Sequence, residues 1–428
     1  MLTQKYLPRL LDTVIERYLE AFGAVEIAGT MWSGKTWTAQ HHGKSYLTLD
    51  DAQARELAIL DIGTILKGET PHVVDEWQIV PATWDAVRGS IDSAGGKRGM
   101  YILTGSSQPH KEFTRHTGSG RIARLRMWPM SLSESGHSSK TISLSKLFDG
   151  QFTGCPVQTN LEDLAYFICR GGWPGALSLS DSAAQLVPLQ YLDALFASMD
   201  NNAPGSEREL RTFMQSLARN IGSVPTLKTI AKDIGLTSNH GDPSDLDTRK
   251  ISSMIDYFLN RYVICDLYGW DAPIKSPSRL RVKPKRCFAD PSLAAALLGA
   301  GPQTLLGNTQ LFGQLFEELC LRDLRVYTSV LPEAHADSLR YYRDADGLEV
   351  DAIIELRDGR WGAIEIKLGA NKVDAGARNL LRLRNKIVAN PAARNPEPSF
   401  MLVLVGKTDF AYQTPEGIIV APITALTP

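Results

Sequence analysis

The chain has 428 residues, enough for roughly two to four domains with buried cores. Its formal net charge is −1, so no whole-chain field draws it toward nucleic acid or a membrane surface. The five cysteines show no Cys-x-x-Cys spacing, and neither a signal-peptide core nor an apolar run of about 18 residues is present. These features argue against a disulfide-rich secreted protein and a membrane-spanning protein, and we expect a cytoplasmic location with no membrane partner.

The first elements predicted in the chain are an amphipathic helix over 9–22 and an apolar strand over 24–28. The next residues, Gly29-Thr-Met-Trp-Ser-Gly-Lys-Thr36, have the spacing G-x-x-x-x-G-K-[ST] of a phosphate-binding loop. Its glycines permit a tight turn of backbone amides, and the helix from about Thr36 directs its positive end to the same place. We predict that ATP binds here, to Gly29, Thr30, Met31, Trp32, Ser33, Gly34, Lys35, Thr36 and Trp37.

Two side chains of this loop have predicted chemical roles. Lys35 would reach the β- and γ-phosphates, and the Thr36 hydroxyl would complete a Mg²⁺ shell. Met31 and Trp32 stand where polar residues are usual, but these positions contribute backbone, so we expect nucleotide binding to persist. The alternative is that these residues form only a glycine-rich turn before a helix. A second motif is needed to favour the phosphate-binding loop.

That second motif is Pro71-His-Val-Val-Asp-Glu76, about forty residues further on. Its β-branched residues predict a buried parallel strand that ends at an active-site edge. Asp75 is the predicted second-sphere Mg²⁺ carboxylate, and Glu76 is the predicted base that orients the attacking water. A solvated acidic pair at a strand end is the alternative. A third strand, over 100–104, ends in hydroxyls, and we predict Thr104 as the residue that senses the γ-phosphate, with Ser106 and Ser107 as the next choices.

Alternating strands and helices predict a parallel sheet with helices on both faces in a P-loop domain over 1–135. The further strands are expected at 45–49 and 121–128, and the further helices at 52–66 and 81–91.

The middle of the chain is predicted to be helical. A linker or lid region over 136–204 precedes a winged-helix-like domain over 205–295, in which 226–236 resembles the first element of a helix-turn-helix. The segment 275–286 contains six basic residues and no acid. It is either a basic wing that contacts a DNA phosphate backbone or a solvated loop whose charges do nothing specific.

The last predicted domain, over 296–428, carries a second acidic constellation on an α/β sandwich. Period-two alternation places Glu365 and Lys367 on one face of a strand, and Asp351 lies on its antiparallel neighbour. With Glu317 from an upstream helix, Asp351 and Glu365 are predicted to hold Mg²⁺ for phosphodiester hydrolysis, while Lys367 positions the nucleophile. The alternative is an amphipathic hairpin with its charged face in water.

The motifs together resemble the AAA-type P-loop ATPases of bacteria and archaea that have a C-terminal uncharacterised domain with a PD-(D/E)xK nuclease-like core. The resemblance implies an α/β protein with an AAA-like parallel-sheet domain, a winged-helix middle and a restriction-endonuclease-like C-terminal domain. Arg121 matches the family's Gly-Arg pair and is a candidate to reach a γ-phosphate in cis or from a neighbour, with a surface arginine as the alternative. The matching segments lie at 5–9, 29–36, 74–78, 103–107, 120–121, 171–174, 313–317, 349–351 and 365–367.

The sequence therefore predicts an ATPase, with ATP and Mg²⁺ as cofactors, that gates a nuclease-like domain acting on nucleic acid. Two alternatives stay open. One is an ATP-dependent regulatory switch whose C-terminal domain no longer cleaves, and the other is a protein-interaction scaffold. DNA and a second copy of the chain are the further candidate partners.

Overall fold

The computed structural model describes the chain except residues 1–5, 109–117, 200–201, 237–243 and 274, so Lys5 of the first matching segment lies outside it. The chain forms two compact units. The first unit comprises Met1–Pro129 and Phe258–Val263, and the second comprises Met130–Tyr257 and Ile264–Pro428. In the described parts, no helix has the length and apolar character needed to cross a bilayer. The bounds of the four predicted domains remain predictions.

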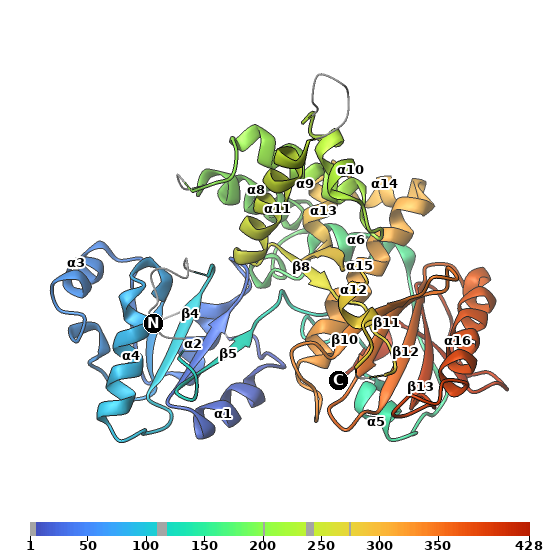
Figure 1. Ribbon diagram of the computed structural model, residues 1–428, viewed down its shortest axis with the longest axis horizontal. Coiled ribbons are helices and arrows are strands. Elements are labelled where there is room, and N and C mark those ends of the chain that lie inside the picture. Colours follow the sequence, from blue (N-terminus) through green and yellow to red (C-terminus); the bar gives the residue numbers. More distant parts are fainter. Residues whose placement is uncertain (1–5, 109–117, 200–201, 237–243, 274) are drawn as a thin grey trace. The chain divides into compact units, whose positions relative to one another are not determined.

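The first unit contains a five-stranded parallel sheet with the strand order β2-β3-β4-β1-β5 (Figure 1). Because all strands run the same way, their carboxyl ends meet at one edge. Three strands are buried along their whole length, as expected for the centre of a parallel sheet covered on both faces. The strands are β1 (Ala24–Ala28), β2 (Ser45–Thr48), β3 (His72–Asp75), β4 (Tyr101–Gly105) and β5 (Ile122–Arg126), close to the predicted ranges.

The helices of the first unit lie close to their predicted positions, with one difference. The helix predicted over 52–66 ends early, and a short 3₁₀ turn follows at Thr64–Leu66. The cause is local, because the Asp61 carboxylate accepts a hydrogen bond from the Gly63 amide at 2.9 Å and holds a turn there. The helices are α1 (Asp12–Ala21), α2 (Lys35–His42), α3 (Ala52–Leu60) and α4 (Ala82–Ser93).

The second unit contains a helical region in the middle of the chain, as predicted. A buried ionic network ties this region to the later helices. The Arg322 guanidinium, 2% exposed, contacts Asp290 at 2.8 Å and Asp323 at 2.7 Å. Asp290 also accepts from the Gly172 amide at 2.9 Å, so the backbone directly after α6 (Leu161–Arg170) is held by a charged side chain. The main helices are α6 (Leu161–Arg170), α8 (Leu186–Ala197), α9 (Glu207–Arg219), α10 (Leu227–Asp233), α11 (Asp245–Asn260), α13 (Pro291–Leu297) and α14 (Pro302–Gly307).

A two-stranded antiparallel hairpin follows α11. It consists of β8 (Ile264–Leu267) and β9 (Lys285–Phe288), with the short helix α12 (Ser278–Arg281) between them. Helices followed by a small hairpin are the element order that a winged helix requires, and the winged-helix assignment itself remains a prediction.

The C-terminal part of the second unit is a seven-stranded mixed sheet with the order β10-β11-β12-β13-β15-β14-β7. Helix α15 (Thr309–Thr328) and helix α16 (Val373–Val388) both pack on its central strands. The strands are β10 (Leu339–Arg343), β11 (Glu349–Glu355), β12 (Trp361–Lys367), β13 (Phe400–Val405), β14 (Phe410–Gln413) and β15 (Ile418–Pro422), with β7 (Cys155–Pro156) at the edge.

Two short strands of the predicted 136–204 linker pair with the C-terminal part of the chain. Strand β7 adds to the edge of the large sheet beside β14, and β6 (Ile142–Ser143) pairs with β16 (Leu426–Thr427). The sequence pattern did not reveal them because a strand of two residues carries no alternation.

Candidate functional site

The phosphate-binding loop lies at the carboxyl edge of the first sheet, directly after β1. A β-carbon at Gly29 would lie 2.2 Å from the Met127 carbonyl oxygen, so no other residue fits without a backbone shift. Gly34 adopts a φ of 97° as α2 begins, a conformation that favours glycine. The predicted binding residues Thr30 and Ser33 are buried, Met31 and Trp37 are half-buried, and Trp32 is 46% exposed.

Lys35 is buried inside this loop. Its ammonium group donates a hydrogen bond to the Thr30 carbonyl oxygen at 2.9 Å. Burial lowers the pKa of Lys35 to about 8, although the nearby charges of Glu76 and Asp75 act in the opposite direction. The ammonium is therefore held by a neutral partner, which a phosphate oxygen can replace.

Asp75, at the end of β3, lies beside Thr36. The Thr36 hydroxyl donates to the Asp75 carboxylate at 3.0 Å, and the Tyr46 hydroxyl donates to it at the same distance. Burial raises the pKa of Asp75, opposed by a hydrogen bond from Thr104. A hydroxyl and a carboxylate side by side are oxygen donors of the kind that Mg²⁺ prefers, so these residues fit the predicted ion.

Glu76 is held next to Asp75 by the end of β4. Its amide donates to the Thr104 hydroxyl at 3.0 Å, and that hydroxyl donates in turn to Asp75. The Glu76 carboxylate accepts from Ser106 at 2.8 Å and from the Gln78 side chain. The structure thus brings Asp75, Glu76 and Thr104 together. Sequence reasoning missed Gln78, although it lies two residues after Glu76 within a matching segment.

The structure does not bring Arg121 to this edge. The parallel register pairs Ala24 with Ile122 and Ala28 with Arg126, so Arg121 lies at the amino edge of the sheet. There its side chain is 47% exposed and forms an ion pair with Asp92 at 2.7 Å. The prediction that Arg121 reaches the phosphate in cis is therefore wrong, because the length of β5 separates it from the phosphate-binding loop.

Arg126, which sequence reasoning did not select, lies at the carboxyl edge. Its guanidinium stacks over the rings of Trp128 and Tyr262, at 4.3 and 4.2 Å from their centroids. Its charge is one of the influences that lower the pKa of Lys35, after burial itself. This strand region contains three arginines, Arg121, Arg124 and Arg126. Arg126 is the one that lies at the carboxyl end of β5, beside Ala28.

The acidic constellation of the second unit also assembles, on strands β11 and β12. The Asp351 carboxylate accepts from the Ile366 amide at 2.8 Å and contacts the Lys367 ammonium at 3.1 Å. Lys367 also forms an ion pair with Glu365, which is 1% exposed. Burial and the charge of Asp351 raise the pKa of Glu365 to about 8, although Lys367 opposes the shift.

Glu317, on α15, meets a lysine that sequence reasoning assigned to the basic segment. The Lys285 ammonium, from β9, contacts Glu317 at 3.2 Å and Glu349 at 2.5 Å. Burial raises the pKa of Glu317 to about 7, as does the charge of Asp351, while Lys285 opposes both. Nothing in the local sequence distinguishes Lys285 from its exposed basic neighbours.

The predicted C-terminal metal site is not formed. Among the residues that the structure describes, no three His, Cys, Asp or Glu side chains are grouped so that they could hold a metal ion. Glu317, Asp351 and Glu365 are each paired with a lysine instead, and an ammonium group lies where a cation would be needed. The carboxylates therefore do not fit Mg²⁺ as predicted, and the role predicted for Lys367, beside a metal-activated nucleophile, has no support from this geometry.

The basic segment 275–286 is partly used within the protein. Arg279 forms a two-pronged ion pair with Glu355 at 2.7 and 2.8 Å, and Arg286 lies 3.6 Å from Asp266. Lys285 is buried, which leaves three exposed basic side chains: Lys275, Arg281 and Lys283.

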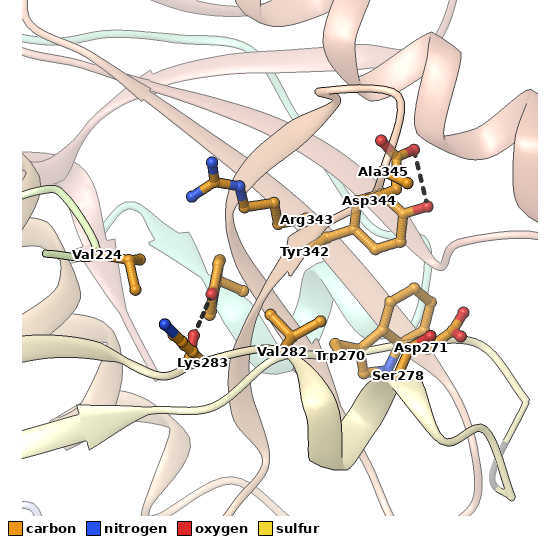
Figure 2. A pocket seen from close by; sticks show the side chains of 11 residues that line it. Val224, Trp270, Asp271, Ser278, Val282, Lys283, Tyr342, Arg343, Asp344 and Ala345 are labelled. Atoms are coloured by element: carbon orange, nitrogen blue, oxygen red, sulfur yellow. Dashed lines mark hydrogen bonds between the residues drawn. The ribbon is translucent and has the colours of Figure 1, made fainter. Parts of the chain in front are cut away.

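A cavity of about 410 Å³ adjoins this segment. Figure 2 shows Lys283 and Arg343 reaching its wall from separate segments, together with Asp271 and Asp344. Charges of both signs line the cavity, so its chemistry does not single out nucleic acid.

Three families match parts of the chain. Residues 22–136 match an AAA domain, residues 161–304 match a domain of unknown function (DUF8612), and residues 312–426 match a second such domain (DUF4143). The N-terminal part is therefore an AAA-type P-loop domain, and this match supports ATP binding. Neither of the other two matches describes a nuclease.

Among solved structures, the chain is similar to a Walker-type ATPase of Pyrococcus abyssi at 10% identity, covering 68% of this chain and 96% of that chain, with a TM-score of 0.41. It is also similar to the Orc1 protein of Aeropyrum pernix, solved in complex with DNA, at 13% identity, covering 69% and 95%, with a TM-score of 0.28. No curated protein matches the chain.

Proposed function

We propose that this AAA-type P-loop domain hydrolyses ATP, and that its nucleotide state switches a second unit that binds a partner without cleaving it. One observation carries the first half of the proposal. The hydroxyls of Thr36 and Thr104 both donate to Asp75, and Glu76 is fixed beside them at the same sheet edge as Lys35. These are the groups that phosphoryl transfer to water requires, which are a phosphate cradle, oxygen donors for a cation and a carboxylate base.

Each residue has a defined task in this proposal. The loop amides and Lys35 bind the phosphate oxygens, while Thr36 and Asp75 hold Mg²⁺. The ion supplies positive charge to the phosphates when it is bound. Glu76 orients the attacking water and accepts its proton, and it must exchange its hydrogen bonds with Ser106 and Gln78 for one to that water.

Thr104 is the proposed sensor of the γ-phosphate. Its hydroxyl bridges the Glu76 amide and the Asp75 carboxylate, so a phosphate oxygen that competes for this hydroxyl changes the contacts of both acids. Arg126 takes the place of Arg121 as the arginine that faces the phosphates in cis. Arg121 would act only on nucleotide held by a neighbouring copy of the chain.

The lysine-paired carboxylates favour the switch over cleavage in the second unit. A hydrolytic metal needs carboxylates that are free to coordinate it, and those of Glu317, Asp351 and Glu365 are occupied by ammonium groups. DNA is the candidate partner through the exposed side chains of Lys275, Arg281 and Lys283. Mn²⁺-dependent cleavage of single-stranded, duplex or branched DNA that Asp351→Ala abolishes would contradict this half of the proposal.

Calorimetric ATP binding and ATP turnover with Mg²⁺ test the first half. We expect the wild-type chain to bind ATP and release phosphate, and Lys35→Ala to lose both activities because the phosphates lose their buried cation. Lys44→Ala, which removes an exposed lysine just after α2, is the matched control and should behave as wild type. A folded wild-type chain that shows no association with ATP would refute the proposal.

A further inference from the structure

We infer that Lys285 and Lys367 act as resident cations that take the place of a divalent metal among the carboxylates of the second unit. The inference concerns only that unit and does not depend on nucleotide binding in the first. It departs from the metal site that the sequence predicted. It also assigns a function to a lysine of the segment 275–286, which the sequence left open as a DNA-contacting wing or a solvated loop.

Lys285 reaches the carboxylates from outside their sheet. It lies on β9, where the antiparallel register pairs it with Leu267, and its side chain is 3% exposed. Its ammonium contacts Glu317 of α15 at 3.2 Å and Glu349 of β11 at 2.5 Å. The nitrogen also lies 5.3 Å from the centre of the Tyr341 ring. Three elements therefore converge on one nitrogen atom, as ligands converge on an ion.

Lys367 supplies the second positive charge. Its ammonium lies 3.1 Å from Asp351 and also pairs with Glu365. Two lysines thus serve the four carboxylates of Glu317, Glu349, Asp351 and Glu365, and together they supply the same formal charge as one Mg²⁺ or Mn²⁺ ion. Buried carboxylates need such compensation, because an unpaired charge away from water is strongly unfavourable.

Two ammonium groups in place of a metal ion change the chemistry that the cluster can perform. An ammonium group donates hydrogen bonds and neutralises carboxylates, but it has no vacant orbital with which to bind and acidify a water molecule. The cluster therefore has two positive charges of its own without metal, and these charges cannot generate a metal-bound nucleophile. A divalent ion could enter only by displacing a buried ammonium.

Mn²⁺ titration of the full chain, in the absence of nucleotide, tests this inference by calorimetry and thermal denaturation. We expect wild type to show no Mn²⁺ binding that depends on Asp351. In Lys285→Met the side-chain stem remains and the charge is lost, so we expect a new Mn²⁺ site and a rise in Tm of about 5 °C at saturation. Adding Glu317→Gln to that variant should abolish both effects, because Glu317 is one of the two carboxylates that Lys285 contacts.

Lys386→Met is the matched control. Lys386 also bridges two carboxylates, Asp344 at 2.7 Å and Asp346 at 2.8 Å, but its side chain is 43% exposed. Because Lys386 and Asp346 are open to water, loss of this ammonium leaves no buried pair of carboxylates, and this variant should gain no Mn²⁺ site.

Two results would overturn the inference. One is Asp351-dependent Mn²⁺ binding by wild type, and the other is a folded Lys285→Met chain that binds no more Mn²⁺ than wild type. If Lys285→Met folds only when Mn²⁺ is present, that rescue supports the inference. If it folds under neither condition, Lys285→Gln, which keeps a hydrogen-bond donor, is judged by the same two results.

Discussion

The two units each contain buried carboxylates close to a lysine, but they stabilise these charges in different ways. In the first unit, Asp75 accepts hydrogen bonds from hydroxyl groups, and Lys35 donates to a backbone carbonyl. In the second unit, Asp351 and Glu365 share the ammonium of Lys367. Neutral partners leave both the negative charge and the lysine available to a ligand, whereas ion pairs cancel the charges against each other.

We infer from this comparison that residue types and spacing alone do not decide whether an acidic cluster can receive a ligand. What decides it is whether the charges are already satisfied by one another. The first unit is arranged to exchange its internal hydrogen bonds for bonds to a phosphate and a cation. The second unit has already made the corresponding contacts with its own side chains.

The largest expected effect tests the candidate ATP site of the first unit. Glu76→Gln should keep ATP binding but lower turnover by about 10²–10⁴-fold, because an amide orients water without accepting its proton. Steady-state phosphate release and calorimetric ATP affinity, measured together, separate the two effects. Unchanged turnover would remove Glu76 as the base, and Gln78→Ala should reduce turnover far less.

The next effect tests the lysine-paired carboxylates of the second unit. Lys367→Met should destabilise the second unit by about 3 kcal/mol, because it leaves Asp351 and Glu365 without a counter-charge in a largely buried place. Denaturant unfolding measures the loss. Lys386→Met removes an exposed lysine and should cost less than about 1 kcal/mol. Equal losses of unfolding free energy in the two variants would show that Asp351 and Glu365 do not depend on the Lys367 charge.

A smaller effect concerns pH. The pKa of Lys35 is lowered to about 8 in the nucleotide-free protein, and bound phosphates favour its charged form. ATP affinity should therefore be nearly constant below pH 8 and fall about tenfold per pH unit above it, with proton uptake on binding. Calorimetry in two buffers of different ionisation enthalpy measures both quantities. In Lys35→Arg the fall should vanish, because a guanidinium stays charged.

The smallest expected effect is that of Arg121→Ala. Its side chain pairs with Asp92 on the surface at the far edge of the sheet, so turnover by dilute protein should change by less than about twofold. A large loss that appears only at high protein concentration would show that Arg121 acts on a neighbouring copy. A large loss at all concentrations would contradict the placement described here.

Much of the first unit could be predicted from the sequence. Its signals are local, because a glycine-rich loop, β-branched strands and terminal acids or hydroxyls each follow one another directly in the chain. Lys35, Asp75 and Thr104 meet since the carboxyl ends of parallel strands share one edge. The prediction for Arg121 conflicts with the same rule. Arg121 begins the strand predicted over 121–128, and the amino end of a parallel strand lies at the edge opposite the phosphate-binding loop.

In the second unit, the shared face of Asp351, Glu365 and Lys367 was predictable from alternation along the strands. Their partners were not. Lys285 lies 66 positions before Asp351 in the sequence, with α13, α14 and α15 between them, and only the folded hairpin brings it to Glu317. Lysine side chains are usually exposed, so a lysine within a basic segment is not expected to be buried. The sequence therefore contains no sign of the contacts of Lys285.

The return of the chain to the first unit at Phe258–Val263 has a consequence for how a nucleotide signal travels. The Asn260 carbonyl accepts from the Gln108 amide at 2.9 Å, beyond the end of β4, and Tyr262 stacks on Arg126. This short piece is continuous with α11 on one side and β8 on the other. The segment is therefore a covalent connection between the neighbourhood of the β4 end and both of these elements, and a fragment ending at Pro129 would lack it.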